Sequence, residues 1–102
     1  MQVIHKIGRR KSAVARDYLS KGKGKITVNN KQLNNYFPTA TLQYKVNQPL
    51  AMTNNEKSFD ISVNVFGGGV MSQADASRLA IAKSLVQFSK KLEKVFLEYD
   101  RQ

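Results

Sequence analysis

The most chemically distinctive stretch of this sequence is a run of positive charge near its start. Up to residue 25 it holds eight lysines and arginines against a single acid, Asp17, which gives a local net charge of +7. A field of that density attracts a polyanion, and each phosphate that a lysine or arginine neutralises releases counterions and so favours binding. The stretch therefore predicts a phosphate-binding surface made by Lys6, Arg9, Arg10, Lys11, Arg16, Lys21, Lys23 and Lys25, called the basic strip below.

The distribution of charge favours this interpretation over a merely solvated surface. Residues 1–50 carry ten bases and one acid, whereas residues 51–102 carry seven bases and six acids, so the formal charge of +10 is concentrated in the first half. A general role in solubility would spread the charge more evenly. Lys31 and Lys45 extend the predicted surface, and we expect the backbone to approach a phosphate closely at Gly8, Gly22, Gly24, Gly67, Gly68 and Gly69.

Residues able to catalyse a reaction or bind a metal are few and scattered. His5 is the only histidine, there is no cysteine, and the acids Asp17, Asp60 and Asp75 lie on separate expected elements. Acid–base and zinc chemistry both need partners that this set does not supply. We therefore expect a protein that is not an enzyme and that uses neither a cofactor nor a metal.

Three consecutive glycines stand between a clear strand pattern and a clear helix pattern. This order suggests nucleotide binding, but the chain has neither Gly-x-Gly-x-x-Gly nor Gly-Lys-Ser/Thr at the helix start. A tight bend is the favoured interpretation, with contact to an RNA phosphate left open. Because the aromatic residues sit in apolar-patterned segments, we assign most of Tyr18, Tyr36, Phe37 and Tyr44 to the core and expect recognition of RNA shape and backbone rather than of bases.

Length and composition point to one domain. A chain of 102 residues with 41% hydrophobic residues can bury one core but not two. No stretch is Pro-rich or repetitive enough to be a linker or a repeat, so residues 1–102 are expected to form a single globular domain. With no cysteine, no signal-like segment and no apolar run long enough to cross a bilayer, the expected location is the cytoplasm, or an organelle that synthesises the protein itself, without membrane contact.

The first half of the chain predicts strands followed by two short helices. Residues 3–7 and 12–20 read as strands, and residues 21–24 predict a hairpin loop that returns as a partner strand over residues 25–28. Residues 31–37 predict a short helix ended by Pro38. Thr39 is expected to cap a second helix, which ends at Asn47 and Gln48 ahead of Pro49.

The second half predicts one strand and one long helix. Residues 58–65 alternate cleanly, which places their apolar side chains on one face, toward the core. A long helix is expected from Ser72, with Ser72 and Asp75 spaced as in a capping box, and it is apolar enough to pack on the sheet. Ser89 is expected to cap a last helix that runs through Leu92, Val95 and Phe96.

Four separated blocks together resemble one known family. They are residues 8–16, 36–38 and 46–50 and, most specifically, Gly67-Gly68-Gly69-Val70-Met71-Ser72-Gln73, which small residues follow at Ala76, Ala80, Ala82 and Ser84. The match runs from residue 3 to residue 88, and its signature is similar, position by position, to the bacterial-type ninth protein of the small ribosomal subunit.

The resemblance implies a structural, rRNA-binding protein in the head of the small subunit, with neighbouring ribosomal proteins as further partners. It also implies an α+β fold, a single two-layer domain whose four-stranded sheet is backed by helices and contains a left-handed strand–helix–strand crossover. Family members extend a basic C-terminal tail toward P-site tRNA. This sequence stops at Gln102 without that tail, so the tRNA contact is carried over to no residue here.

The leading hypothesis is thus a ribosomal protein that clamps small-subunit rRNA through a basic N-terminal strand and hairpin and so supports translation. Two alternatives from other classes stay open. One is a non-ribosomal RNA-binding or RNA-chaperone module, and the other is a small metabolic enzyme of the same fold. The enzyme would need an acid or histidine facing a pocket beside Gly67, Gly68 and Gly69, and none can be named from the sequence.

Overall fold

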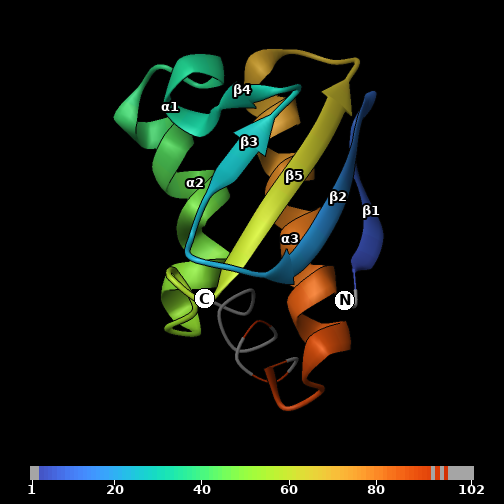
Figure 1. Cartoon of the computed structure of the whole chain (residues 1–102). Coiled ribbons are helices and arrows are strands. Elements are labelled where there is room, and N and C mark those ends of the chain that lie inside the picture. Colours follow the sequence, from blue (N-terminus) through green and yellow to red (C-terminus); the bar gives the residue numbers. More distant parts are fainter. Residues whose placement is uncertain (1–2, 93, 95, 97–102) are drawn as a thin grey trace.

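The computed structural model describes residues 3–92, 94 and 96 of the chain, which form a sheet with helices against one of its faces (Figure 1). Residues 92, 94 and 96 are helical, in the segment that Ser89 was expected to cap. The elements of regular structure are, in order, β1 (Ile4–Arg10), β2 (Ala13–Lys21), β3 (Ile26–Val28), β4 (Lys31–Gln32), α1 (Leu33–Tyr36), α2 (Ala40–Met52), β5 (Phe59–Phe66) and α3 (Val70–Phe88).

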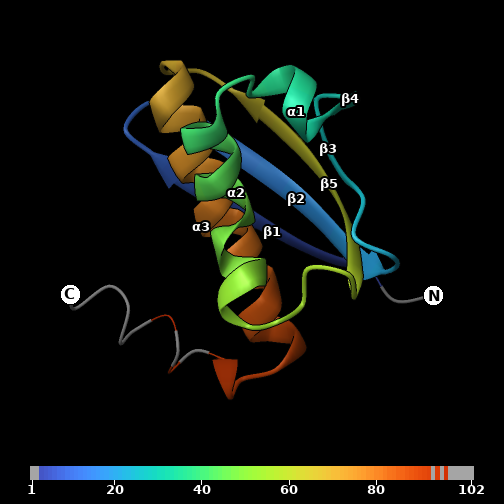
Figure 2. The same ribbon diagram turned by 90° about the vertical axis from the view of Figure 1, so that its left-hand side faces the viewer.

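The sheet has the strand order β1-β2-β5-β3-β4, with β3 and β5 parallel and every other neighbouring pair antiparallel. Helices α2 and α3 lie on one face, and no helix of the described residues lies on the other face (Figures 1 and 2). In Figure 1 the helices lie behind the sheet and β5 follows β3 to the right, so the crossover through α1 and α2 is left-handed. The α+β prediction is confirmed, with five strands in place of four because the two-residue β4 pairs with β3.

The core lies between the sheet and the two long helices. Strand β5 alternates as predicted, and Phe59, Ile61, Val63 and Val65 are all buried. Its central position explains this regular pattern, since its inner face must be apolar along its whole length. Helix α3 contributes residues such as Ala74, Ile81 and Leu85 to this core, and all three are fully buried.

The predicted hairpin between residues 12–20 and 25–28 is wrong, because β5 lies between β2 and β3. The loop after β2 instead passes across the start of β5. The Gly22 N–H donates to the Ser58 carbonyl (3.0 Å), and the Ile61 N–H donates to the Lys25 carbonyl (2.8 Å). The two glycines correctly predicted that the chain reverses its direction after β2. They carry no information on which strand pairs with β2.

The predicted helix over residues 31–37 begins later than expected. Lys31 and Gln32 form β4, which pairs with β3 across a turn at Asn29 and Asn30, both in the left-handed region with φ of 51° and 66°. Asn29 also bonds the backbone of Val65 through both ends of its side-chain amide. This contact with a strand distant in sequence sets the turn, so local helical spacing was misleading.

Two predicted helix boundaries are also wrong. Helix α2 begins after Thr39, whose hydroxyl accepts from the Leu42 N–H (3.4 Å) as predicted, but it continues through Pro49 to Met52. Burial of Val46 and Leu50 in the core outweighs the one backbone bond that proline cannot make. Helix α3 begins at Val70 with Gly69 as its N-cap, so the capping box expected from Ser72 does not form.

The closest approach between α3 and the sheet occurs at Gly8 of β1. A Cβ placed there would collide with the Ala76 carbonyl oxygen and lie 2.6 Å from the Ala80 nitrogen. Ala76 and Ala80 are completely buried, so small residues on both sides bring the two backbones together. Helix α3 can therefore pack this closely on β1 only because Gly8 has no side chain.

We expect Gly8→Ala to lower the free energy of unfolding by about 1–3 kcal/mol, because two backbones must separate to admit one methyl group. Gly69→Ser is the matched control, since a Cβ at Gly69 meets nothing within 4 Å and a serine can cap α3. Urea unfolding of both variants measures the difference. Equal stability of Gly8→Ala and the wild type would contradict this account of the packing.

Candidate nucleic-acid interface

The strand register divides the basic strip between the two faces of the sheet. Residues of β1 that pair with inward-facing residues of β2 point toward the helices, and the alternate residues point away from them. Arg9, opposite Val14, and Arg16, opposite Ile7 and Asn64, therefore lie on the face without helices. Lys6, opposite the buried Asp17, lies on the helical side.

Most of the predicted cations are accessible to a partner. Lys6 and Lys45 are half-buried, whereas the others are exposed, namely Arg9, Arg10, Lys11, Arg16, Lys21, Lys23, Lys25 and Lys31. Lys11 stands in the turn between β1 and β2, where its φ is 55°, and Lys23 and Lys25 belong to the loop after β2. The structure thus distributes these charges over both faces of the sheet, the turn after β1, the loop after β2 and helix α2 instead of gathering them at a single point.

Two of the predicted cations contact an acid of the same chain. The Lys45 ammonium lies 2.7 Å from one carboxylate oxygen of Asp75, and Arg10 Nε lies 3.8 Å from the other. The pair with Lys45 links α2 to α3, which gives Lys45 a role within the protein. Arg10 is 62% exposed and more distant, so its guanidinium remains available to another anion.

The loop after β2 is held in shape by Asp60. One of its carboxylate oxygens accepts hydrogen bonds from the N–H groups of Lys23 (3.0 Å), Gly24 (3.2 Å) and Lys25 (3.0 Å). These bonds, the one from Lys25 foremost, lower the pKa of Asp60. The acid consequently orders the loop backbone and leaves the ammonium groups of Lys23 and Lys25 free to face outward. This role of Asp60 does not follow from the sequence, because the predicted pairing of residues 12–20 with residues 25–28 leaves no place for β5 beside the loop.

All but one of the glycines expected to approach a phosphate lie close to other parts of this chain, and Gly69 is the exception. A Cβ atom at Gly22 would collide with the Asp60 carboxylate, and one at Gly67 would collide with the Ser12 carbonyl oxygen. Gly67 and Gly68 have φ of 77° and 61°, so they form the tight bend favoured over a nucleotide site. Gly24, with φ of 105°, lies beside the Glu56 carbonyl oxygen, and Gly69 faces open space at the start of α3.

The single acid of the basic strip, Asp17, is withdrawn from the surface. Its side chain is completely buried and accepts bonds from the Ser84 hydroxyl (2.7 Å) and the Lys6 N–H (3.1 Å). Desolvation by burial raises its pKa from 3.8 to about 7, against the opposing effect of these bonds. Asp17 joins β1 and β2 to α3, and at neutral pH it offers no competing anion at the surface.

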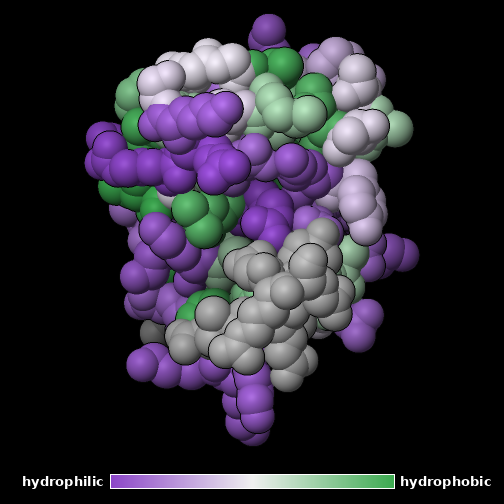
Figure 3. All heavy atoms as spheres, turned by 180° about the vertical axis from the view of Figure 1, so that it is seen from behind, coloured by the Kyte–Doolittle hydropathy of each residue, from purple (hydrophilic) through white to green (hydrophobic). Residues whose placement is uncertain are grey.

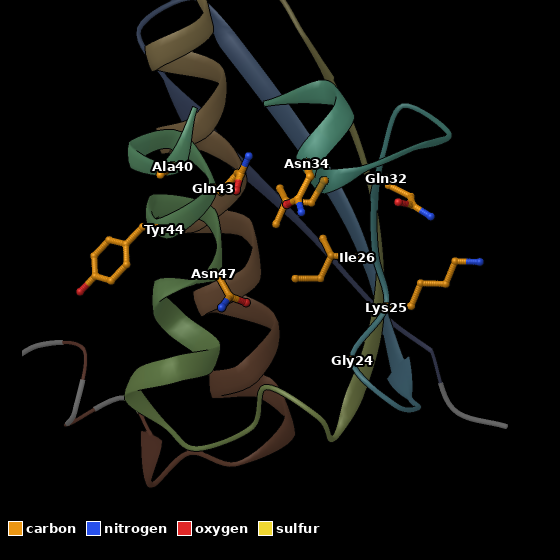
Figure 4. A pocket seen from close by; sticks show the side chains of 10 residues that line it. Gly24, Lys25, Ile26, Gln32, Asn34, Ala40, Gln43, Tyr44 and Asn47 are labelled. Carbon is orange, nitrogen blue, oxygen red and sulfur yellow. The ribbon is translucent and has the colours of Figure 1, made fainter. Parts of the chain in front are cut away.

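A pocket of about 460 Å³ lies between α2 on one side and residues 24–26, Gln32 and the start of α1 on the other (Figure 4). Amide side chains of Asn34, Gln43 and Asn47 line it, while Tyr44 points outward from α2. The Gln43 amide donates to the Phe37 carbonyl (2.9 Å). The described residues around this pocket include no acid or histidine, the types that acid–base catalysis uses most.

The helical side of the molecule is largely hydrophilic, with hydrophobic spheres interspersed among the polar ones (Figure 3). Among the described residues, no helix combines the length and apolar character that spanning a membrane requires. In that same part of the chain, no three acidic or histidine side chains gather as metal ligands would. The arrangement is that of a small, basic α+β binding protein.

Comparison with known proteins gives the family. The sequence model of the family described as Ribosomal protein S9/S16 matches residues 8–101. The chain is 62% identical over 86 residues to the small ribosomal subunit protein uS9 of Christiangramia forsetii, covering 84% of this chain and 67% of that protein. It is 59% identical over 87 residues to uS9 of Flavobacterium psychrophilum (85% and 68% covered) and 48% identical over 89 residues to uS9 of Bacteroides fragilis (87% and 70%).

The chain therefore belongs to the ribosomal protein S9/S16 family. This confirms the resemblance found in four blocks of the sequence. It also confirms that the chain is not an enzyme, since its relatives are structural proteins of the ribosome.

The buried carboxyl of Asp17 makes stability depend on pH. Because its pKa is raised from 3.8 to about 7, the folded state holds a proton that the unfolded state releases between these values. The contribution of Asp17 to the free energy of unfolding is therefore fully present below about pH 4. It decreases as the pH rises toward 7, by up to about 4 kcal/mol. We expect Asp17→Asn to remove this dependence, because the amide can both accept from Lys6 and donate to Ser84.

Denaturant unfolding at several pH values between about 4 and 8 measures this effect. Asp75→Asn is the control and should retain the decline, because Asp75 is ion-paired at the surface of α3. The same change in stability with pH in the wild type and in Asp17→Asn would contradict this account, because it would show that Asp17 holds no extra proton in the fold between about pH 4 and pH 7.

Proposed function

We propose that this chain is a structural protein of the small ribosomal subunit that binds and clamps folded small-subunit rRNA through the basic strip. Its partners are that rRNA and neighbouring proteins of the subunit head, and its location is the ribosome in the cytoplasm. Family membership and the names of its relatives support the ribosomal role. Residues 1–102 act in this proposal as one rRNA-binding domain.

The observation that carries the clamp is the combination of exposed cations with a buried acid. Arg9 and Arg16 are exposed on paired strands, and Asp17, which follows Arg16 directly, is completely buried on the opposite face. The alternation of a strand produces this separation without any special geometry. The surface that would face RNA is therefore positive, while the carboxyl of Asp17 forms its hydrogen bonds inside the protein.

The mechanism is neutralisation of phosphates by cations that are already positioned. Strand pairing fixes the backbone of Arg9 and Arg16, and Asp60 fixes the backbone of Lys23 and Lys25. RNA binding therefore has to order only their side chains, because the backbone is already ordered. Guanidinium forks match phosphate oxygens in pairs, which suits them to a folded RNA with a definite backbone path. Lys45 is the weakest member of the set, because Asp75 already holds its ammonium group.

The salt dependence of binding tests this mechanism. If six to eight phosphates are engaged, log affinity should fall against log salt with a slope of roughly −4 to −7. Replacing Arg9 and Arg10 together with alanine should weaken binding across RNA sequences and make the slope less steep by about 1–2. Filter binding to small-subunit rRNA provides the measurement.

Replacing Lys90 and Lys91 with alanine removes the same charge from exposed positions beyond α3, outside the basic strip, and serves as the matched control. That variant should retain the wild-type affinity within about threefold. A slope near zero for the wild type, or equal losses in both double variants, would refute the clamp.

Association with the subunit separates an integral ribosomal protein from a free RNA-binding or RNA-chaperone module. We expect the chain to remain with small subunits during sedimentation at high salt, because the surrounding RNA fold and neighbouring proteins enclose it even when salt weakens the phosphate contacts. Quantitative release into the supernatant, with folded protein recovered there, would favour the non-ribosomal alternative.

A further inference from the structure

Several aromatic groups are exposed on the face of the sheet opposite to α2 and α3. Tyr18 is 37% exposed and Phe66 is 55% exposed, and His5 is exposed beside Tyr18. The register places Tyr18 opposite Ser62, and Phe66 opposite Val14, so both rings belong to the face away from the helices. The prediction that most of Tyr18, Tyr36, Phe37 and Tyr44 belong to the core is wrong for Tyr18 and for Tyr44, which is 65% exposed.

His5 and Tyr18 form a preassembled flat surface. They face each other across β1 and β2, and their rings stack with centroids 4.5 Å apart and an angle of 18° between their planes. The His5 ring is held further by a hydrogen bond between Nδ1 and the Asp17 carbonyl (3.0 Å). A planar group that stacks on this pair would not have to order it first.

The two arginines of this face lie beside and between the aromatic groups. Arg9 pairs with Val14, next to Phe66, and Arg16 lies in the row between those of Tyr18 and Phe66. Four residues of β2 separate the rows of Tyr18 and Val14, a distance of roughly 13 Å along the strand. The aromatic groups are thus far enough apart to contact different planar groups, with a guanidinium between them.

The charge of this face selects the kind of partner. Asp60 is the acid that points to this side from β5, and one of its oxygens is occupied by three backbone N–H groups. Asp17, the acid of β2, is buried on the other side. Cations and planar rings with little opposing charge match a polyanion that carries planar groups, which describes RNA whose bases are unpaired.

We propose that the open face of the sheet binds unpaired nucleotides of RNA, with one base on the His5–Tyr18 pair and another on Phe66. Arg9 and Arg16 neutralise the phosphates that join or flank these nucleotides. This proposal rests on the proposed RNA-binding function and adds base stacking to the backbone contacts of the clamp. The preference it implies is for single-stranded over fully paired RNA, because a duplex keeps its base faces stacked.

Binding of an oligouridylate of about eight nucleotides, compared with an RNA duplex of the same length, tests the inference. Tyr18→Leu and Phe66→Leu should each weaken single-strand binding about 5- to 100-fold and leave the salt slope unchanged, since no charge is altered. Tyr44→Leu is the matched control, because Tyr44 is 65% exposed on α2, away from this face, and its loss should not change affinity.

Ring proton resonances provide a second measurement that does not depend on variants. Those of Tyr18 and Phe66 should shift when oligouridylate is added, and those of Tyr44 should not. If both leucine variants bind the oligomer as the wild type does, while Arg9→Ala with Arg10→Ala still weakens rRNA binding, base stacking is refuted and the clamp stands. Stronger binding of the duplex than of the single strand would also overturn the proposal, and would leave this face to a protein neighbour.

Discussion

The packing of α3 against β1 and β2 is the constraint on which the rest of this structure depends. It requires Gly8 at the point of closest approach and small residues, Ala76 and Ala80, opposite it. It is reinforced by the bonds of Ser84 to the buried carboxyl of Asp17. Once one face of the first two strands is committed to this contact, the alternate residues must face away from the helices.

The functional surface follows from that commitment. A strand that buries Ala13, Ala15, Asp17 and Leu19 necessarily presents Arg16 and Tyr18 on its other side. The same segment therefore supplies a core face and the surface proposed to bind RNA, without a separate binding motif. The cost is a buried acid, which is tolerated because hydrogen bonds satisfy it and because its raised pKa lets it hold a proton near neutrality.

Stretches governed by local pattern were predicted well. The alternation in β5, the N-cap at Thr39 and the charge of the basic strip all depend on residues close in sequence, so they could be recognised before any fold was known. The family, which four blocks of residues indicated, was confirmed by the comparisons. Boundaries were predicted less well, because burial of Leu50 carries α2 past Pro49 and a contact from Asn29 to β5 makes a turn where a helix was expected.

The sequence by itself determined the sign and location of the charge, the lack of a catalytic set and the apolar faces of the main strands. Each of these is a property of residue types and of their spacing. Only the tertiary structure decided that β5 separates β2 from β3, that Asp17 is hidden while Tyr18 is exposed, and that Asp60 holds the loop of Lys23 and Lys25. These outcomes depend on contacts between residues far apart in the chain. The local pattern of a strand does not record which other strand it pairs with or which of its faces the helices cover.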